Sequence, residues 1–144
     1  MYIAIALLAG AGLAFQAVIN SRLRAELGSP VWAAIAQGVV GFGLLGVMAL
    51  VVRPSAPALA GLSRLPWWIW TGGLLGTTYV VAAIVATPPL GAALLVALII
   101  VGQTAAALLI DHYGWFGVEV SSLTPIRTVG AALLVAGVLL IRYR

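Results

Sequence analysis

Residues 89–110 read PLGAALLVALIIVGQTAAALLI, a stretch without a single charged side chain. Its length is close to the roughly 20 residues that a helix needs to cross the hydrocarbon core of a bilayer. Lipid offers no hydrogen bonds to the backbone, so a spanning segment must satisfy its own amide and carbonyl groups as a helix does. The stretch from Pro89 to Ile110 therefore predicts a transmembrane helix.

Similar apolar runs fill most of the remaining chain on both sides of this segment. With it they make five predicted spans, which are Tyr2–Asn20, Pro30–Val52, Pro66–Ala86, Pro89–Ile110 and Pro125–Ile141. Four of the five begin with proline, which at the first helical position gives up only an amide that has no partner there. The first run lacks a basic segment before it and is long for a signal peptide, so we expect a retained helix. We predict an all-α, polytopic integral membrane protein, with residues 1–144 forming one transmembrane domain.

Composition supports this class and excludes several functions. Of the 144 residues, 64% are hydrophobic and 7% are charged, and the mean hydropathy is +1.21. Lipid must therefore be the main partner of the surface. The chain has no cysteine and one histidine, which argues against disulfides and most metal sites. It shows no nucleotide-binding loop, nucleophile motif or basic stripe, so we predict no enzyme activity, no cofactor, no metal and no nucleic-acid partner.

The arginines are nearly balanced between the two sides of the predicted membrane. One side carries four and the other three, namely Arg22, Arg24, Arg142 and Arg144 against Arg53, Arg64 and Arg127. This small bias places the C-terminus in the cytoplasm if the orientation is single. It also fits insertion in both orientations, which would let two chains form an inverted pair. We therefore expect an antiparallel homodimer or a heterodimer with a sister chain.

Small residues recur on the predicted spans, and the chain has 17 glycines. Gly72 and Gly76 have the GxxxG spacing, and Gly130 and Gly137 lie near one face of the last span. In lipid, such residues allow helix backbones to approach closely. Tight helix packing is the favoured interpretation, and a backbone-lined substrate path is the alternative.

Neutral polar side chains within the spans suggest a second role. Gln16 and Asn20 lie four residues apart on the first span, in line with Gly12, while Gln37 and Gln103 lie within the second and fourth spans. Carboxamides are costly in hydrocarbon unless they meet one another, a backbone group or water. They either form hydrogen bonds between helices or line a substrate cavity.

Two opposite charges lie where the helix dipole disfavours each of them. Asp111 ends the fourth span and Arg127 lies in the first turn of the fifth. This placement predicts an ion pair across the connection between the spans. The alternative is a proton-coupling or gating role for Asp111, together with the neighbouring His112.

The segments that carry these features resemble a known family. They are QAVINSRLRAELGSPVWAA (16–34), PWWIWTGGLLGTTYV (66–80) and PPLGAALLVALIIVGQTAAALLIDHYGWFG (88–117). Together they are similar to the YdcZ-type family of small bacterial inner-membrane proteins, in the drug/metabolite transporter superfamily. The resemblance implies five spans per unit, a multi-pass location in the bacterial inner membrane, and single chains, paired chains or fused halves of opposite orientation.

The last span carries a weaker resemblance. VGAALLVAGVLLI (129–141) is similar to the dimer-forming last helix of the small multidrug resistance proteins. On that analogy, Gly130 and Gly137 would carry the contact between protomers. Those relatives use a glutamate within the first helix for proton-coupled exchange of cations. The first span here has no acidic residue, so neither proton coupling nor cation specificity is carried over.

Together these observations predict a small integral membrane transporter. We expect it to export a small metabolite or amphipathic compound by alternating access in a dimer, with four helices lining a cavity and the fifth holding the dimer. The predicted substrate-binding residues are four carboxamides and three aromatic side chains: Gln16, Asn20, Gln37, Gln103, Phe15, Trp68 and Tyr79. The alternatives are a non-transporting membrane scaffold or accessory subunit, and a passive channel. Interfacial anchoring is the simpler interpretation of the tryptophans.

Overall fold

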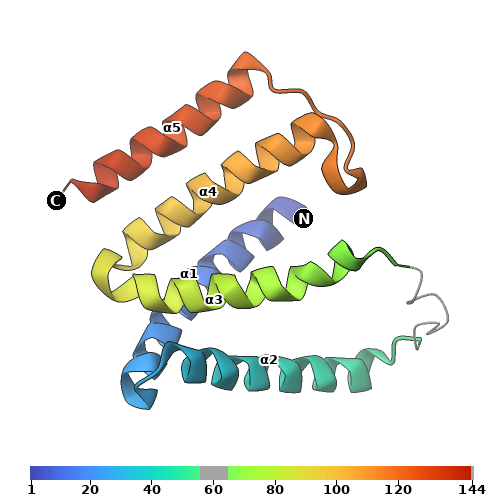
Figure 1. Cartoon of the computed structure of the whole chain (residues 1–144), viewed down its shortest axis with the longest axis vertical. Helices are drawn as coiled ribbons and strands as arrows, with labels where there is room; N and C mark the ends of the chain where they lie inside the picture. The colour runs from blue at the N-terminus through green and yellow to red at the C-terminus, as the bar shows by residue number, and fades with distance from the viewer. Residues whose placement is uncertain (56–64, 144) are drawn as a thin grey trace. The chain divides into compact units, whose positions relative to one another are not determined.

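The structure, a computed structural model, describes residues 1–55 and 65–143 and confirms an all-helical chain (Figure 1). The five long helices are α1 (Tyr2–Leu27), α2 (Pro30–Val52), α3 (Thr71–Leu90), α4 (Ala92–Tyr113) and α5 (Pro125–Arg142). In the described ranges, the short 3-10 helix η2 (Trp67–Trp70) precedes α3, and the short 3-10 helix η3 (Trp115–Gly117) follows α4. All five predicted spans correspond to helices long and apolar enough to cross a membrane. Arg64 and Arg144, which enter the arginine balance, lie outside the described residues.

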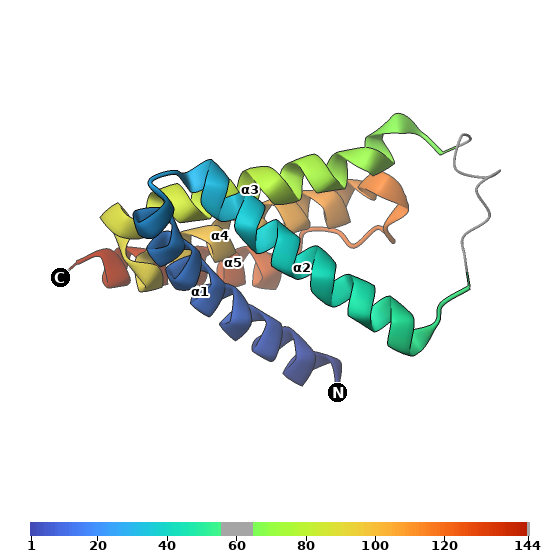
Figure 2. The same cartoon turned by 90° about the horizontal axis from the view of Figure 1, so that it is seen from below.

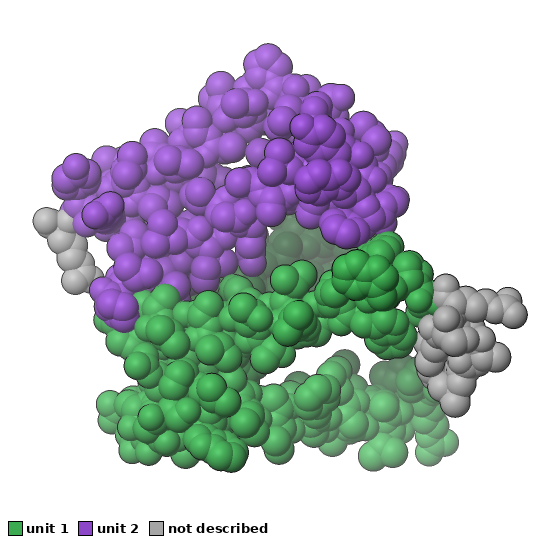
Figure 3. All heavy atoms as spheres, in the orientation of Figure 1, with its two compact units in different colours: residues 1–88 green, residues 89–144 purple. Residues whose placement is uncertain are grey.

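The chain divides into two compact units, which Figure 3 shows in different colours. Unit 1 runs from Met1 to Pro88 and unit 2 from Pro89 to Arg144. Among the described residues, α1 packs along α2 in unit 1 and α4 packs along α5 in unit 2. Each pair is formed by helices adjacent in the chain.

Capping residues fix the starts of α2 and α5 at Pro30 and Pro125, which are the predicted positions. Ser29 Oγ accepts hydrogen bonds from the amides of Val31 and Trp32 at 3.2 and 3.4 Å. Thr124 Oγ1 accepts one from the amide of Arg127 at 3.4 Å. In both helices proline directly follows the capping residue. Because proline has no amide hydrogen, the first turn of each helix has one fewer unpaired donor.

The first helix continues beyond its predicted end at Asn20 and stops at Leu27. The added turns carry Arg22 and Glu26, whose side chains pair at 3.6 Å with the four-residue spacing that suits a helix surface. Gly28 then ends the helix in the left-handed conformation, with φ of 68°. Hydropathy marks where charges begin, whereas the helix ends where the backbone leaves helical geometry.

The predicted helix start at Pro89 is wrong. Helix α3 runs through Pro88 and Pro89 to Leu90, and the break falls at Gly91, with φ of 76° and ψ of 162°. Proline has a helix-compatible φ, and its main defect is the missing amide. Glycine reaches a positive φ at little cost, so Gly91 separates the helices. The predicted start at Pro66 also shifts, since η2 precedes the α-helix that begins at Thr71.

The core of unit 1 is small and lies near the connection between α1 and α2. Figure 2 shows these two helices extending from that connection. The buried residues are mostly small and come from all three long helices: Ala17, Asn20, Ala33, Ala83, Ile84 and Thr87. Thr87 Oγ1 donates to the Ala83 carbonyl at 2.7 Å and approaches the Ala17 carbonyl at 3.5 Å. Small side chains and this hydroxyl bring α3 against α1.

In unit 2, α4 and α5 run in opposite directions next to each other (Figure 1). Leu95, near the start of α4, and Val138, near the end of α5, are buried. At the opposite end of the pair, residues 114–124 connect the helices. The two helices are therefore joined at one end by packing and at the other by a structured connection.

The glycines of the spans do not mediate packing inside the described part of the chain. A Cβ atom added at Gly72, Gly76, Gly130 or Gly137 would meet nothing within 4 Å. The same holds for Gly12 on α1. Close packing at these positions is thus absent among the described residues, and their faces have room for other molecules.

Candidate functional site

A groove of about 540 Å³ lies between α1 and α2 in unit 1. We call it the amide groove because three carboxamides lie among the residues that line it. The lining residues are Gly12, Phe15, Gln16, Ile19, Asn20 and Leu23 from α1, and Ala36, Gln37 and Val40 from α2. Most of the lining is apolar, and the carboxamides supply its polar groups.

Helical spacing places the predicted polar stripe on this groove. Gly12, Gln16 and Asn20 are four residues apart and so lie on one face of α1. On α2, Gln37 faces the same space, with Val40 three residues further along the helix. The stripe that the sequence indicated on α1 is therefore matched by a carboxamide on α2.

Two of the carboxamides bond to each other across the helices. Asn20 Nδ2 donates a hydrogen bond to Gln37 Oε1 at 2.7 Å. Asn20 is buried, with 5% of its surface exposed, and Gln37 is half-buried. A carboxamide has two donors and two acceptor lone pairs, so one mutual bond leaves further hydrogen-bonding capacity at the groove. The predicted interhelical hydrogen bonding is confirmed for this pair.

Gln16 lies one helical turn from Asn20 and is half-buried. Within the described part of the chain its side chain makes no hydrogen bond. Its donor and acceptor atoms therefore have no partner among the described residues, although the surface of the amide groove itself is almost entirely apolar. This makes Gln16 the polar residue best placed to bind a ligand there.

The other predicted binding residues are distributed over both units. Phe15 lines the amide groove. Trp68, in η2, and Tyr79, on α3, belong to unit 1, but neither is among the residues lining the groove. Gln103 lies on α4 in unit 2, where its side chain is exposed. Four of the seven predicted residues thus lie together at one groove.

Unit 2 contains the second polar cluster, at the end of α4 and the start of α5. The predicted ion pair is present, because Arg127 Nη2 donates to Asp111 Oδ2. The other terminal nitrogen of the guanidinium, Nη1, bonds to both the carbonyl and the hydroxyl of Ser121 at 2.9 Å. The side chains of Asp111 and Arg127 are 31% and 29% exposed, respectively. Ser121 is not among the predicted residues, because no sequence pattern marks it as a partner of the ion pair.

Backbone contacts extend this cluster through the connection. The amide of Ser121 donates to the Asp111 carbonyl at 2.8 Å, and the amide of Leu123 donates to His112 Nδ1 at 3.3 Å. His112 thus acts as an acceptor at Nδ1. We call this set, made of Asp111, His112, Ser121 and Arg127, the interhelical latch, since it joins the end of α4 to the start of α5.

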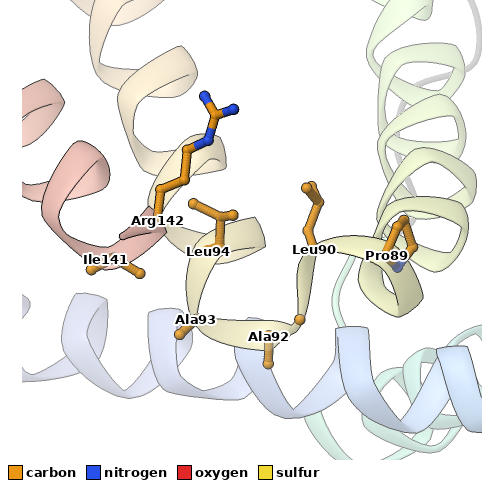
Figure 4. Close-up of a pocket in the computed structure, with 8 residues that line it drawn as sticks. Pro89, Leu90, Ala92, Ala93, Leu94, Ile141 and Arg142 are labelled. Atoms are coloured by element: carbon orange, nitrogen blue, oxygen red, sulfur yellow. The ribbon is translucent and has the colours of Figure 1, made fainter. Parts of the chain in front are cut away.

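Unit 2 contains a cavity of about 280 Å³ between the start of α4 and the end of α5. Figure 4 shows Arg142 extending to the same side as Leu90 and Leu94. Arg142 is the charged residue of this cavity, whose other lining residues are Pro89, Gly91, Ala92, Ala93 and Ile141. The two units therefore differ in the charge of their cavities.

Residues that could hold a metal ion do not gather in the described ranges. No group of three or more histidine, cysteine, aspartate or glutamate side chains occurs there. The polar chemistry at the amide groove is limited to hydrogen bonding by carboxamides.

Five apolar helices of membrane-crossing length define a small, multi-pass α-helical membrane protein. The sequence profile of a family described as "Putative inner membrane exporter, YdcZ" matches residues 1–140. The chain belongs to this YdcZ family, within the drug/metabolite transporter group, and is an inner-membrane protein. It is similar to the inner membrane protein YdcZ of Escherichia coli (strain K12), with 31% identity over 138 residues that cover 94% of this chain and 91% of the relative. No solved structure matches the chain.

Proposed function

We propose that this protein exports a small metabolite or amphipathic compound across the inner membrane by alternating access. The observation that carries the proposal is the amide groove, an apolar space of about 540 Å³ with three carboxamides in its lining. Its volume lies within the roughly 300–1,000 Å³ typical of small-molecule sites. The exporter description of the family supports the same activity.

In this proposal Gln16 and the Asn20–Gln37 pair bind the polar part of the substrate, and Phe15 contacts its apolar part. Gln103, Trp68 and Tyr79 would complete the pathway. Two chains of opposite orientation would form the working dimer, with Gly130 and Gly137 at their contact. Space beside both glycines supports this assignment. In an inverted pair the inward-open and outward-open states are equivalent, so a substrate need not favour one of them strongly.

The interhelical latch would act on coupling or gating in this scheme. Asp111, His112 and Arg127 are the latch residues with charged or imidazole side chains, and a change at any of them would alter the link between α4 and α5. Asp111→Asn tests this role in a flux assay run with and without a proton gradient. Loss of the gradient's effect supports coupling, and an unchanged gradient response leaves the latch with its structural role.

Flux in proteoliposomes across a panel of labelled metabolites and amphipathic compounds tests the export proposal. We expect the native chain to move at least one compound, and Gln16→Met or Gln103→Ala to reduce that flux. Thr78→Val is a matched control, because Thr78 donates to the Leu74 carbonyl of its own helix at 2.9 Å and does not line the amide groove. Unchanged flux in both glutamine variants would remove these residues from the pathway.

Dual orientation is tested by reporters at the C-terminus that are active on one side of the membrane only. Comparable signals from both sides support an antiparallel homodimer. A signal from one side alone would reject that homodimer and favour a sister chain.

A membrane scaffold or accessory subunit is the second candidate, and the Asn20–Gln37 hydrogen bond favours it. Side chains that satisfy each other can hold helices together without binding a substrate. A scaffold predicts no flux for any compound and no ligand at the amide groove. A passive channel, the third alternative, predicts flux that does not saturate with concentration.

A further inference from the structure

We propose that the amide groove binds an uncharged amphipathic molecule that carries a carboxamide-like donor and acceptor pair, in preference to an organic ion. This inference rests on the proposed export function and names the substrate class of the same site. Three properties of the groove carry it: the charge of its lining, its hydrogen-bonding groups, and its size.

The lining residues are all uncharged. None of the nine residues that line the groove has an ionisable side chain. The next ionisable residue along α1 beyond Asn20 is Arg22, which is largely exposed and pairs with Glu26 at 3.6 Å. An ion moved from water into an apolar site without a counter-charge loses much of its hydration free energy. The groove therefore disfavours cations and anions alike.

The hydrogen-bonding groups of the groove are complementary to an amide. Gln16 carries an N–H donor and a C=O acceptor on one planar group, and neither is used within the described part of the chain, although little polar surface faces the groove. A ligand carboxamide can donate to one and accept from the other in a reciprocal pair. Asn20 and Gln37 hold each other at 2.7 Å, so they are already oriented before a ligand arrives. Such a preformed polar site rejects molecules that lack the matching groups.

The apolar residues that line the groove determine which apolar groups the rest of the ligand can carry. Phe15, Ile19 and Val40 line the groove near the carboxamides, and they can cover an aromatic ring or a short alkyl chain. A volume of about 540 Å³ accommodates a drug-sized compound. A molecule with an apolar body and a single amide end satisfies both parts of the groove.

Photolabelling of the full chain in nanodiscs tests this inference without relying on transport. The probe is phenylpropanamide bearing a diazirine on its ring, and labelled peptides are mapped by mass spectrometry. Four competitors share nearly one shape: phenylpropanamide, phenylpropanoate, phenylpropylammonium and propylbenzene. We expect label on residues 12–23 and 36–40, and we expect phenylpropanamide to compete at concentrations about tenfold lower than the other three.

Variants at Gln16 separate hydrogen bonding from shape. Gln16→Met keeps the length of the side chain and removes its polar atoms, so labelling should fall about tenfold. Gln16→Glu adds a negative charge, and phenylpropylammonium should then become the best competitor. Thr78→Val should label as the native chain does. Equal competition by an ion or by propylbenzene, or label confined to residues outside the groove, would overturn the inference.

Flux measured on the same preparation separates failure of this inference from failure of the export proposal. A protein that moves an organic ion but neither binds nor moves the amide contradicts the substrate class alone. A protein that binds the amide selectively at the groove but moves no compound contradicts export alone.

Discussion

Units 1 and 2 each join two long apolar helices through a polar pair, but the pairs differ in charge and in surroundings. Unit 1 uses the neutral Asn20–Gln37 pair beside the amide groove. Unit 2 uses the charged Asp111–Arg127 pair, which is further bonded to Ser121 at the helix ends. The charged pair is placed where a connection supplies additional partners, and the neutral pair lies where most neighbours are apolar. The charged pair links α4 to α5 in unit 2, whereas the neutral pair of unit 1 lies beside the groove that we propose as the ligand site.

The largest expected effect is a loss of stability at Gly114, which ends α4, compared with Gly28, which ends α1. Gly114 has φ of 64°, and a Cβ there would lie 2.6 Å from Val120 Cγ2. We expect Gly114→Ala to destabilise the protein by about 2–4 kcal/mol, because backbone strain and a steric clash add. The measurement is unfolding in mixed micelles titrated with SDS.

Gly28 provides the matched control in unit 1. Its φ is 68°, but a Cβ there would meet nothing within 4 Å among the described residues. Gly28→Ala should cost about 1 kcal/mol, the backbone part alone. Equal costs at the two glycines would show that the connection in unit 2 is not tightly packed.

The ion pair should give the next largest effect. Asp111→Asn leaves the Arg127 guanidinium without its carboxylate partner, and we expect a loss of about 1–2 kcal/mol in unfolding free energy. This value is reduced from that of a fully buried pair because both side chains are about one-third exposed. Glu26→Gln breaks the more exposed Arg22–Glu26 pair and should change stability by less than about 0.5 kcal/mol. If Asp111→Asn and Glu26→Gln lower the unfolding free energy by the same amount, the latch does not hold unit 2 together.

The neutral pair should show a smaller effect with a distinctive pattern. Asn20→Leu leaves the Gln37 carboxamide without its partner and should cost about 1 kcal/mol. Adding Gln37→Met should recover part of that loss, since both polar groups are then removed. A double-mutant cycle on SDS unfolding measures the coupling energy. Purely additive effects would contradict the hydrogen bond between α1 and α2.

Much of this arrangement follows from sequence because it depends on local rules. Hydropathy located the five spans, and the unfavourable helix-end positions of Asp111 and Arg127 predicted their ion pair, which is present. Helical spacing also placed Gln16 and Asn20 on one face of α1, where both line the amide groove.

What the sequence left open depends on geometry between segments. The choice of Gln37 as the partner of Asn20 requires the crossing of α1 and α2, which no spacing rule supplies. Ser121 joins the latch through the course of residues 114–124 rather than through a motif. The break at Gly91 in place of Pro89 depends on which residue adopts a positive φ. Local patterns therefore predicted elements and faces, and tertiary geometry decided partners and boundaries.

The role of unit 1 is tested most directly by comparing the native chain with Gln16→Met. The measurement is the flux of phenylpropanamide into proteoliposomes, normalised to the amount of folded protein. Gln16 lines the groove and makes no hydrogen bond within the described residues, so its replacement should leave the unfolding midpoint nearly unchanged. We expect the flux through Gln16→Met to be about tenfold lower than through the native chain, and the flux through Thr78→Val to equal it. Equal flux through the native chain and Gln16→Met would contradict the assignment of the amide groove as the ligand site.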